Sequence, residues 1–225
     1  MKTTAIIVAG GQGARLKSRV PKAFVRLAGR PMVEYSLDAY QAADKVSEII
    51  LVKPATHRQN LSYLFDRYPK LAAIVPGGRE RPDSVKAGLA AVSGKTGIVL
   101  IHDAARPLIE PRSIAAVISA AQRHGAAILA APVTDTIKRA RRGRVAGTVD
   151  RSDLWRAQTP QGFTVAALST AHRRHNRKHA TDDSQLAEAA GIAVFIVPGP
   201  DRNLKITTQD DLEIATCLLR KKRNG

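Results

Sequence analysis

The chain has 225 residues, 44% of them apolar, a normal share for one packed α/β domain. No stretch reaches the roughly 20 apolar residues of a membrane helix, and the first residues enter a strand pattern without a signal-peptide cleavage site, so we expect a cytoplasmic protein with no membrane partner. Thirty-six Lys and Arg against 19 Asp and Glu give a net charge of +17 and indicate an anionic partner, but aromatic residues make up only 4% and are not interleaved with the basic runs, which disfavours nucleic acid.

Short apolar runs alternate with longer segments of helical period, and this alternation predicts a mainly parallel sheet. The strands are expected at Thr4–Val8, Glu48–Val52, Ala72–Val75, Ile98–His102, Ala126–Ala131 and Ala193–Val197. The helices are expected at Val33–Ala43, His57–Tyr68, Asp83–Val92, Pro111–His124, Val165–His175, Asp182–Ala190 and Gln209–Leu219. We therefore predict a single Rossmann-like α/β domain over residues 1–225 with helices on both faces of the sheet. Ligands bind such sheets at the carboxyl ends of the strands.

Two polar β-like runs interrupt this alternation and predict a projecting hairpin arm over about residues 134–152. They are Thr134–Ala140 and Val145–Asp150, separated by a turn that contains Gly143. An isolated hairpin is marginal in water, so we expect the arm to pack against a second subunit of a homodimer.

The end of the chain carries two minor expectations. The basic tail, residues 220–225, reads as disordered. The lone cysteine, Cys217, lies in the apolar pattern of the last helix and reads as a small core residue.

A glycine-rich loop follows the first strand. It contains Gly10, Gly11 and Gly13 after Ala9, and glycines at this place let backbone amides approach phosphate oxygens. A dinucleotide fingerprint would need a third glycine where Leu16 stands and an acidic residue after the second strand. Neither requirement is met, so the loop is not a dinucleotide site.

A P-loop is excluded by similar reasoning. The string Ser93-Gly-Lys-Thr96 lacks the required glycine, which falls at Leu89, and it follows a helix rather than a strand. The glycine loop is instead followed by two cations, Arg15 and Lys22. This combination suits a triphosphate bound with Mg²⁺, because fixed cations and the metal offset the charge of a nucleotidyl transfer.

Two further strings offer polar groups at the expected strand ends. The turn before the third helix, with Gly78 and Ser84, presents backbone amides and a hydroxyl to a base or ribose, or is an ordinary capped helix. At the end of a buried strand, Asp103 would orient Mg²⁺ or a substrate hydroxyl and Arg106 would hold a phosphate. The alternative is an Asp–Arg pair that braces the following helix.

The remaining candidates lie at the base of the arm and near the last helix. Thr136, Thr159 and Arg151 flank the hairpin, and Lys205 stands at a strand-like end, where it would reach a substrate phosphate or remain an exposed lysine. His102, directly before Asp103, is expected to be a hydrogen-bonded core histidine.

In this order the strings resemble the 2-C-methyl-D-erythritol 4-phosphate cytidylyltransferase family of the non-mevalonate isoprenoid pathway, from about Ala5 to Leu219. They are the glycine loop with Pro21-Lys22, Pro76-Gly-Gly with Asp83-Ser-Val, His102-Asp-Ala-Ala-Arg-Pro, Asp135-Thr-Ile-Lys, Gln158-Thr-Pro-Gln, Thr181-Asp-Asp and Asn203-Leu-Lys-Ile-Thr. The resemblance implies transfer of a cytidylyl group from CTP to 2-C-methyl-D-erythritol 4-phosphate (MEP).

The resemblance also implies roles for individual residues. Arg15 and Lys22 would stabilise the pentavalent α-phosphate. The nucleotide would contact Ala9, Gly10, Gly11, Gly13, Gly78, Ser84 and Asp103. The methylerythritol phosphate would contact Asp103, Arg106, Thr136, Thr159 and Lys205, with Arg151 reaching the site of the other subunit.

Three positions depart from the common family pattern. Gly10 stands where many members have alanine, Arg79 occupies a position that is often smaller or acidic, and Arg202 replaces a residue that is acidic in some members. The alternative within the same fold is a ribitol 5-phosphate cytidylyltransferase. A basic nucleic-acid-binding module is indicated only by the charge.

Overall fold

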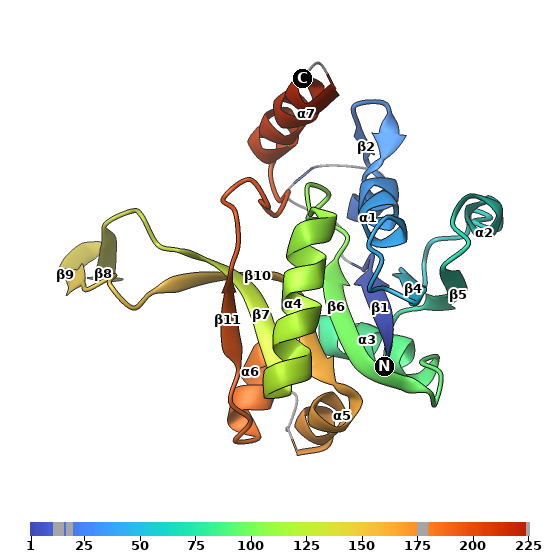
Figure 1. The fold of residues 1–225 in the computed structure, drawn as a ribbon. Helices are drawn as coiled ribbons and strands as arrows, with labels where there is room; N and C mark the ends of the chain where they lie inside the picture. The colour runs from blue at the N-terminus through green and yellow to red at the C-terminus, as the bar shows by residue number, and fades with distance from the viewer. Residues whose placement is uncertain (11–15, 17–19, 175–179, 224–225) are drawn as a thin grey trace.

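The computed structural model describes residues 1–10, 16, 20–174 and 180–223. Its centre is a seven-stranded sheet with the order β11-β7-β10-β6-β1-β4-β5 (Figure 1). The strands are β1 (Lys2–Val8), β4 (Glu48–Lys53), β5 (Leu71–Pro76), β6 (Thr96–Asp103), β7 (Ala126–Pro132), β10 (Trp155–Thr164) and β11 (Phe195–Pro198). All neighbouring pairs are parallel except those of β10, which runs antiparallel to both β6 and β7. The mainly parallel sheet is confirmed, whereas β10 was expected only as the return of the arm.

Helices cover both faces of the sheet. They are α1 (Met32–Gln41), α2 (Tyr63–Arg67), α3 (Arg81–Ala90), α4 (Pro111–His124), α5 (Val165–Arg174), α6 (Asp183–Ala189) and α7 (Gln209–Arg223). In β1, Ala5 and Ile7 join the core under α1 and α4, while Ile6 and Val8 join the core under α3, α5 and α6. A strand segment that is buried on both faces has no side turned to solvent, which explains the apolar run from Ala5 to Val8.

Helix α2 begins later than the sequence pattern predicts. The expected helix started at His57, but residues before Tyr63 form turns. The backbone N–H of Ser62 donates to the side-chain oxygen of Asn60 at 2.8 Å, a local bond that competes with helical pairing. His57 instead stacks on Phe24, with 3.8 Å between ring centroids.

Helix α7 corrects two expectations. It continues to Arg223, whereas the sequence pattern places its end at Leu219 and a disordered tail after it. Lys and Arg have a high helix propensity, which explains the extension. Leu212, Ala215 and Leu219, spaced by three and four residues, form the face of α7 that packs in a third apolar cluster. That cluster also contains Leu27 and Met32. Cys217 lies off this face and is exposed, so it is not a core residue.

A short hairpin of β2 (Arg26–Leu27) and β3 (Arg30–Pro31), preceded by the 3-10 helix η2 (Lys22–Phe24), leads into α1. The second hairpin is the predicted arm. Its strands β8 (Ile137–Arg141) and β9 (Arg144–Val149) form a separate two-stranded sheet that projects from the body (Figure 1). Arg142 and Gly143 both have positive φ, 49° and 78°, as the twist-matched two-residue turns require.

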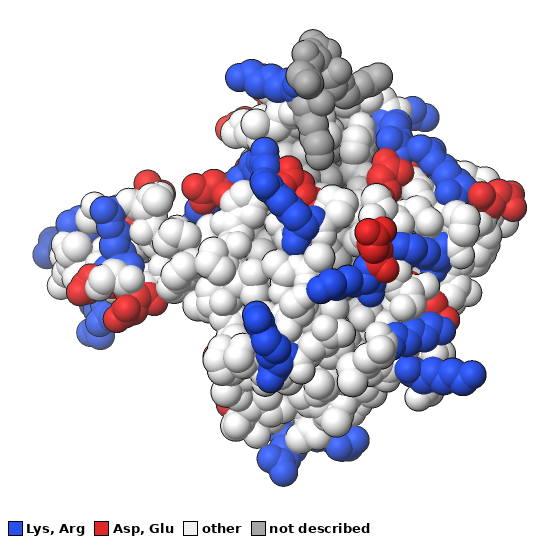
Figure 2. Space-filling view, viewed as in Figure 1, with Lys and Arg blue, Asp and Glu red and all other residues white. Residues whose placement is uncertain are grey.

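Two surface properties bear on partners. Lys and Arg side chains are scattered over the visible face and the arm, with acidic groups between them, rather than gathered in one patch (Figure 2). Within the described ranges, no helix combines the length and apolar character needed to cross a membrane.

Candidate active site

The predicted nucleotide segments meet at the carboxyl edge of the sheet. Val8, the last residue of β1, pairs with Asp103, the last residue of β6, and the chain continues beyond Val8 into Ala9 and Gly10. A Cβ added to Gly10 would lie 3.5 Å from the Ser84 hydroxyl, so the start of the glycine loop adjoins the start of α3. That distance is an ordinary contact, and the alanine that many family members have at this position would fit.

The turn before α3 is closely packed. A Cβ on Gly78 would lie 2.2 Å from the Asp83 Cβ, so only glycine allows the turn to approach the helix this closely. The Ser84 hydroxyl is buried and donates to the Glu80 carbonyl at 3.2 Å. Its oxygen therefore remains available to a ligand as an acceptor.

Of the two cations predicted to be catalytic, only Lys22 lies within the described residues. Lys22 opens η2 directly after Pro21, and its side chain is partly buried. Arg15, Gly11 and Gly13 lie outside the described residues.

Asp103 is the charged centre of this edge. Its carboxylate binds Arg81 Nε at 3.2 Å and Lys205 Nζ at 2.6 Å. Burial alone would raise the pKa of Asp103, but the charges of Arg81 and Lys205 outweigh it and hold the pKa well below its usual range. Asp103 is therefore ionised at neutral pH and serves as an acceptor rather than as a proton donor.

Arg81 links Asp103 to a second buried carboxylate and was not singled out by the sequence. Its Nη1 lies 2.7 Å from Asp183 Oδ2, and Asp183 also contacts His172 at 3.3 Å. Burial lowers the pKa of Arg81, but Asp183 and Asp103 raise it by more, so the guanidinium stays charged. A buried Asp103 needs a cation as its partner, and this need was the one sign of Arg81 in the sequence. No spacing in the sequence identifies Arg81 as that cation.

Residues 199–206, here called the strap, bring Lys205 to Asp103. The buried Asn203 donates to Gln158 Oε1 at 2.9 Å and to the Thr159 carbonyl at 3.0 Å. At its end the Ile206 N–H donates to the Ala105 carbonyl at 2.8 Å. These bonds tie the strap to β10 and to the segment after β6, so Lys205 is placed by its neighbours.

Arg106 braces the strap. Its guanidinium donates to the Asn203 carbonyl at 2.8 Å and to the Ala157 carbonyl at 3.1 Å. These bonds join the strap to β10 instead of bracing α4. The contact of Arg106 with a substrate phosphate stays a prediction.

Thr159 and His102 lie beneath Asp103. The Thr159 hydroxyl accepts from the Asp103 backbone N–H at 3.1 Å and lies 3.0 Å from His102 Nδ1. Both side chains are buried, and burial lowers the pKa of His102 to about 3, so its ring is neutral. The expectation of a hydrogen-bonded core histidine is confirmed.

Thr136 and Arg151 are not brought to this cluster within one subunit. Both are exposed at the base of the arm, and Arg151 donates to the Thr134 carbonyl. Their place is the arm, not the edge of the sheet.

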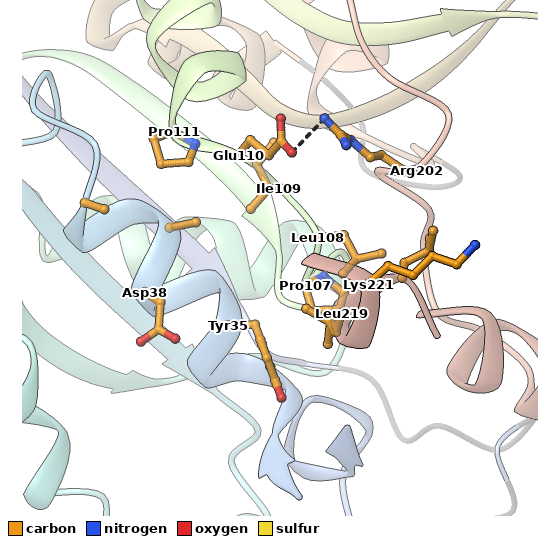
Figure 3. Close-up of a pocket in the computed structure, with 13 residues that line it drawn as sticks. Tyr35, Asp38, Pro107, Leu108, Ile109, Glu110, Pro111, Arg202, Leu219 and Lys221 are labelled. Carbon is orange, nitrogen blue, oxygen red and sulfur yellow. Dashed lines mark ion pairs between the residues drawn. The ribbon is translucent and has the colours of Figure 1, made fainter. Parts of the chain in front are cut away.

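A cavity of about 630 Å³ lies elsewhere, between α1, the segment before α4 and the end of α7 (Figure 3). Tyr35, Leu108 and Leu219 line it, and Arg202 forms a 2.8 Å ion pair with Glu110 at its rim. None of the predicted site residues lines this cavity. Arg202, one of the three positions that depart from the common family pattern, thus has an ion-pair partner in Glu110.

The chain is similar along nearly its whole length to one enzyme family. The family model of IspD, 2-C-methyl-D-erythritol 4-phosphate cytidylyltransferase, matches residues 3–221. The enzyme of that name from Pelotomaculum thermopropionicum is 44% identical over 100% of this chain and 96% of its own length, and that from Bacillus licheniformis is 42% identical over 100% and 99%. The crystal structure of the Thermus thermophilus enzyme of the same name superposes with a TM-score of 0.81 at 33% identity and covers 96% of this chain and 98% of its own.

A second structure, the 4-diphosphocytidyl-2C-methyl-D-erythritol synthase of Anaerococcus prevotii, has a TM-score of 0.85 at 29% identity and covers 97% of this chain and 98% of its own. These likenesses favour MEP over ribitol 5-phosphate and over a nucleic-acid module. The chain belongs to the 2-C-methyl-D-erythritol 4-phosphate cytidylyltransferase family and transfers a cytidylyl group from CTP to MEP in isoprenoid precursor biosynthesis.

Proposed function

We propose that the two substrates meet at the carboxyl ends of β1 and β6, within one nucleotidyltransferase domain acting in the cytoplasm. The observation that carries this proposal is the register of Val8 opposite Asp103, which sets the start of the glycine loop, Ala9 and Gly10, beside the Asp103–Lys205 pair. CTP lies on the loop side and MEP on the strap side. Phosphoryl groups of both then lie among fixed cations.

The nucleotide is held mainly by backbone groups. Gly10, Gly11 and Gly13 present amides to the phosphates, while Ala9, Gly78 and Ser84 surround cytosine and ribose. The close packing of Gly78 on α3 and the acceptor oxygen of Ser84 support this assignment. A donor such as the exocyclic amine of cytosine suits an acceptor of this kind.

The chemical step forms one bond and breaks one. A phosphate oxygen of MEP attacks the α-phosphorus of CTP, and the bond to the β-phosphate bridging oxygen breaks to release pyrophosphate. The attacking phosphate is already ionised, so no general base is required. Arg15 and Lys22 stabilise the extra negative charge that develops around the α-phosphorus.

MEP is recognised through both its hydroxyls and its phosphate. The ionised Asp103 accepts hydrogen bonds from substrate hydroxyls, and Lys205, whose side chain is 42% exposed, offers charge to the phosphate. Arg106 supports this recognition by binding the strap that carries Lys205, and Thr159 supports it by accepting from the Asp103 main-chain N–H.

Magnesium fits this site as a companion of CTP. Among the described residues no group of three His, Cys, Asp or Glu side chains gathers to form a metal cage, and both oxygens of Asp103 already contact cations. Mg²⁺ commonly keeps several waters and binds substrate phosphates, so the triphosphate would supply its other ligands. When bound, it neutralises part of the triphosphate charge.

The arm completes the site of a second subunit in this proposal. Val145 on β9 is 68% exposed and Trp155 at the start of β10 is 39% exposed, so the arm region presents apolar surface without a core of its own. In a two-fold dimer this surface would pack on the partner and deliver Thr136 and Arg151 to the partner's MEP.

The experiment measures pyrophosphate release from CTP and Mg²⁺ as MEP is varied, with ribitol 5-phosphate in parallel. Lys205→Ala should raise the KM for MEP at least about tenfold and leave the KM for CTP within about twofold, because Lys205 lies on the strap side. The control, Lys95→Ala, removes an exposed charge before β6 at the opposite edge and should change neither. If the KM for CTP rises instead, the two substrates are placed the wrong way round.

A further inference from the structure

The backbone N–H of Asp103 has an unusual partner for a residue in a sheet. Strand β10 pairs with β6 only from Gln161 opposite Ile101 to Thr164 opposite Ile98. Beyond Gln161 the pairing of β10 continues with β7 alone. The same antiparallel register would place Thr159 opposite Asp103, but the Thr159 carbonyl accepts from Asn203 of the strap instead. The Thr159 hydroxyl takes that place and accepts from the Asp103 N–H at 3.1 Å.

The Thr159 hydroxyl is held in turn by His102. The fully buried imidazole places Nδ1 3.0 Å from Thr159 Oγ1 and Nε2 3.4 Å from Ser36 Oγ on α1. Because the ring is neutral, one nitrogen donates and the other accepts. The Tyr40 ring, 5.1 Å from the imidazole centroid, packs beside it. The imidazole therefore bridges α1 and β10 beneath the substrate edge.

We propose that His102 is a positioning residue for MEP, which holds the Thr159 hydroxyl in the one rotamer that anchors the Asp103 main chain. The Asp103 carboxylate is thereby kept between Arg81 and Lys205. Without the imidazole, the χ1 rotamer of Thr159 loses this support, and in another rotamer its Oγ1 no longer accepts from the Asp103 N–H. This inference rests on the proposed role of Asp103 in MEP binding, and it assigns Thr159 a contact with the protein rather than with the substrate.

Two substitutions of His102 distinguish the role of Nδ1 from that of Nε2. The amide of an asparagine reaches the position of Nδ1, whereas that of a glutamine reaches the position of Nε2. His102→Gln should therefore raise the KM for MEP by about tenfold with the KM for CTP within about twofold, and His102→Asn should raise the KM for MEP by less than about threefold. The control Ser36→Ala removes only the Nε2 contact and should resemble His102→Asn.

Equal KM values for MEP in His102→Asn and His102→Gln, or a Ser36→Ala variant as impaired as His102→Gln, overturn the proposal. If Lys205→Ala leaves the KM for MEP unchanged, the proposed MEP site itself is wrong. If Lys205→Ala acts as expected and His102→Gln does not, only the role of His102 is lost.

A second measurement covers the case in which His102 variants do not fold. In the native enzyme, the ¹⁵N resonances of the His102 ring should show a neutral imidazole that does not titrate between about pH 5 and 9. Thr159→Ser, which keeps the hydroxyl, should retain the wild-type KM for MEP more closely than Thr159→Val. Titration of His102 within that range, or a Val variant equal to the Ser variant, contradicts the proposal.

Discussion

The strap and the arm are both irregular additions to the sheet, and they differ in where their polar groups find partners. On the strap, Asn203 is fully buried and bonds two groups of β10 within its own subunit. On the arm, β8 and β9 pair only with each other, and Val145 is largely exposed. The strap finds its partners within one subunit, whereas the proposed partner of the arm is a second subunit.

This difference teaches how the site is assembled. The Asp103 cluster is preorganised, because main-chain and buried side-chain bonds fix its members before substrate arrives. In the proposed dimer, the arm residues are fixed by the surface of the partner subunit. The following substitutions probe first the body of the subunit and then the arm.

The largest effect should come from the catalytic cations of the body. Lys22→Ala and Arg15→Ala should each lower kcat about 100-fold or more, because each removes a charge that acts mainly in the transition state. Steady-state pyrophosphate release checks this, with circular dichroism to confirm folding. Lys95→Ala, the exposed-charge control, should keep wild-type kcat, and a fully active Lys22→Ala enzyme would show that the catalytic centre lies elsewhere.

A smaller effect, on stability, should come from Asp103. Asp103→Asn should lower the free energy of unfolding by about 1 to 2 kcal/mol at pH 7, a modest loss because Lys205 is partly exposed. The pKa of Asp103 is lower in the folded chain than its ordinary value of 3.8, so this stabilisation is present above that pH and is lost as the pH falls below about 4. Urea unfolding from pH 3 to 8 measures the difference between the two proteins.

Plotted against pH, the free energies of unfolding of the wild type and of Asp103→Asn should differ by a constant amount from pH 6 to 8. The difference should shrink as the pH falls to 3. A difference that persists unchanged at pH 3 would mean that the carboxylate charge is not what stabilises the cluster. The control Asp44→Asn changes an exposed carboxylate and should leave the free energy of unfolding unchanged from pH 3 to 8.

The smallest effect should come from the turn of the arm. Arg142 has a φ of 49°, which asparagine tolerates better than arginine, so Arg142→Asn should preorganise the hairpin. If the arm forms the dimer contact, the dissociation constant should fall by about two- to fivefold, as a gain of up to about 1 kcal/mol allows. Sedimentation equilibrium measures it, and Arg141→Asn, one residue earlier, is the matched control. An unchanged constant would separate the arm from dimerisation.

The parallel strands and the arm could be predicted because their signals are local. Strand β10 could not, since Pro160 and two glutamines interrupt its apolar pattern. The structure explains the polarity: Gln161 accepts from the Asp183 and Ser184 backbone N–H groups, both at 3.1 Å, and donates to Asp182 at 2.8 Å. These bonds hold α6 against the strand, and no local pattern announces them.

The candidate site divides in the same way. Asp103 and Lys205 stand in recognisable strings, but Arg81 gains its meaning from Asp103 and Asp183, which lie 22 and 102 positions further along the chain. The hydrogen-bond partners of Arg106 are likewise main-chain carbonyls that lie far away in the sequence. A single sequence identifies groups that need partners more readily than it identifies the partners.

The central claim, that the body of one subunit and the arm of the other share a site, is tested by mixing Lys22→Ala with Arg151→Ala after subunit exchange. In a mixed dimer, the Arg151→Ala subunit keeps its own Lys22 and receives an intact Arg151 from its partner, while the other site lacks both. Equal amounts that exchange at random make half of the dimers mixed, so about a quarter of all sites should regain activity. If Arg151 serves its own subunit, every site lacks one cation, and the absence of recovered activity would contradict the shared site.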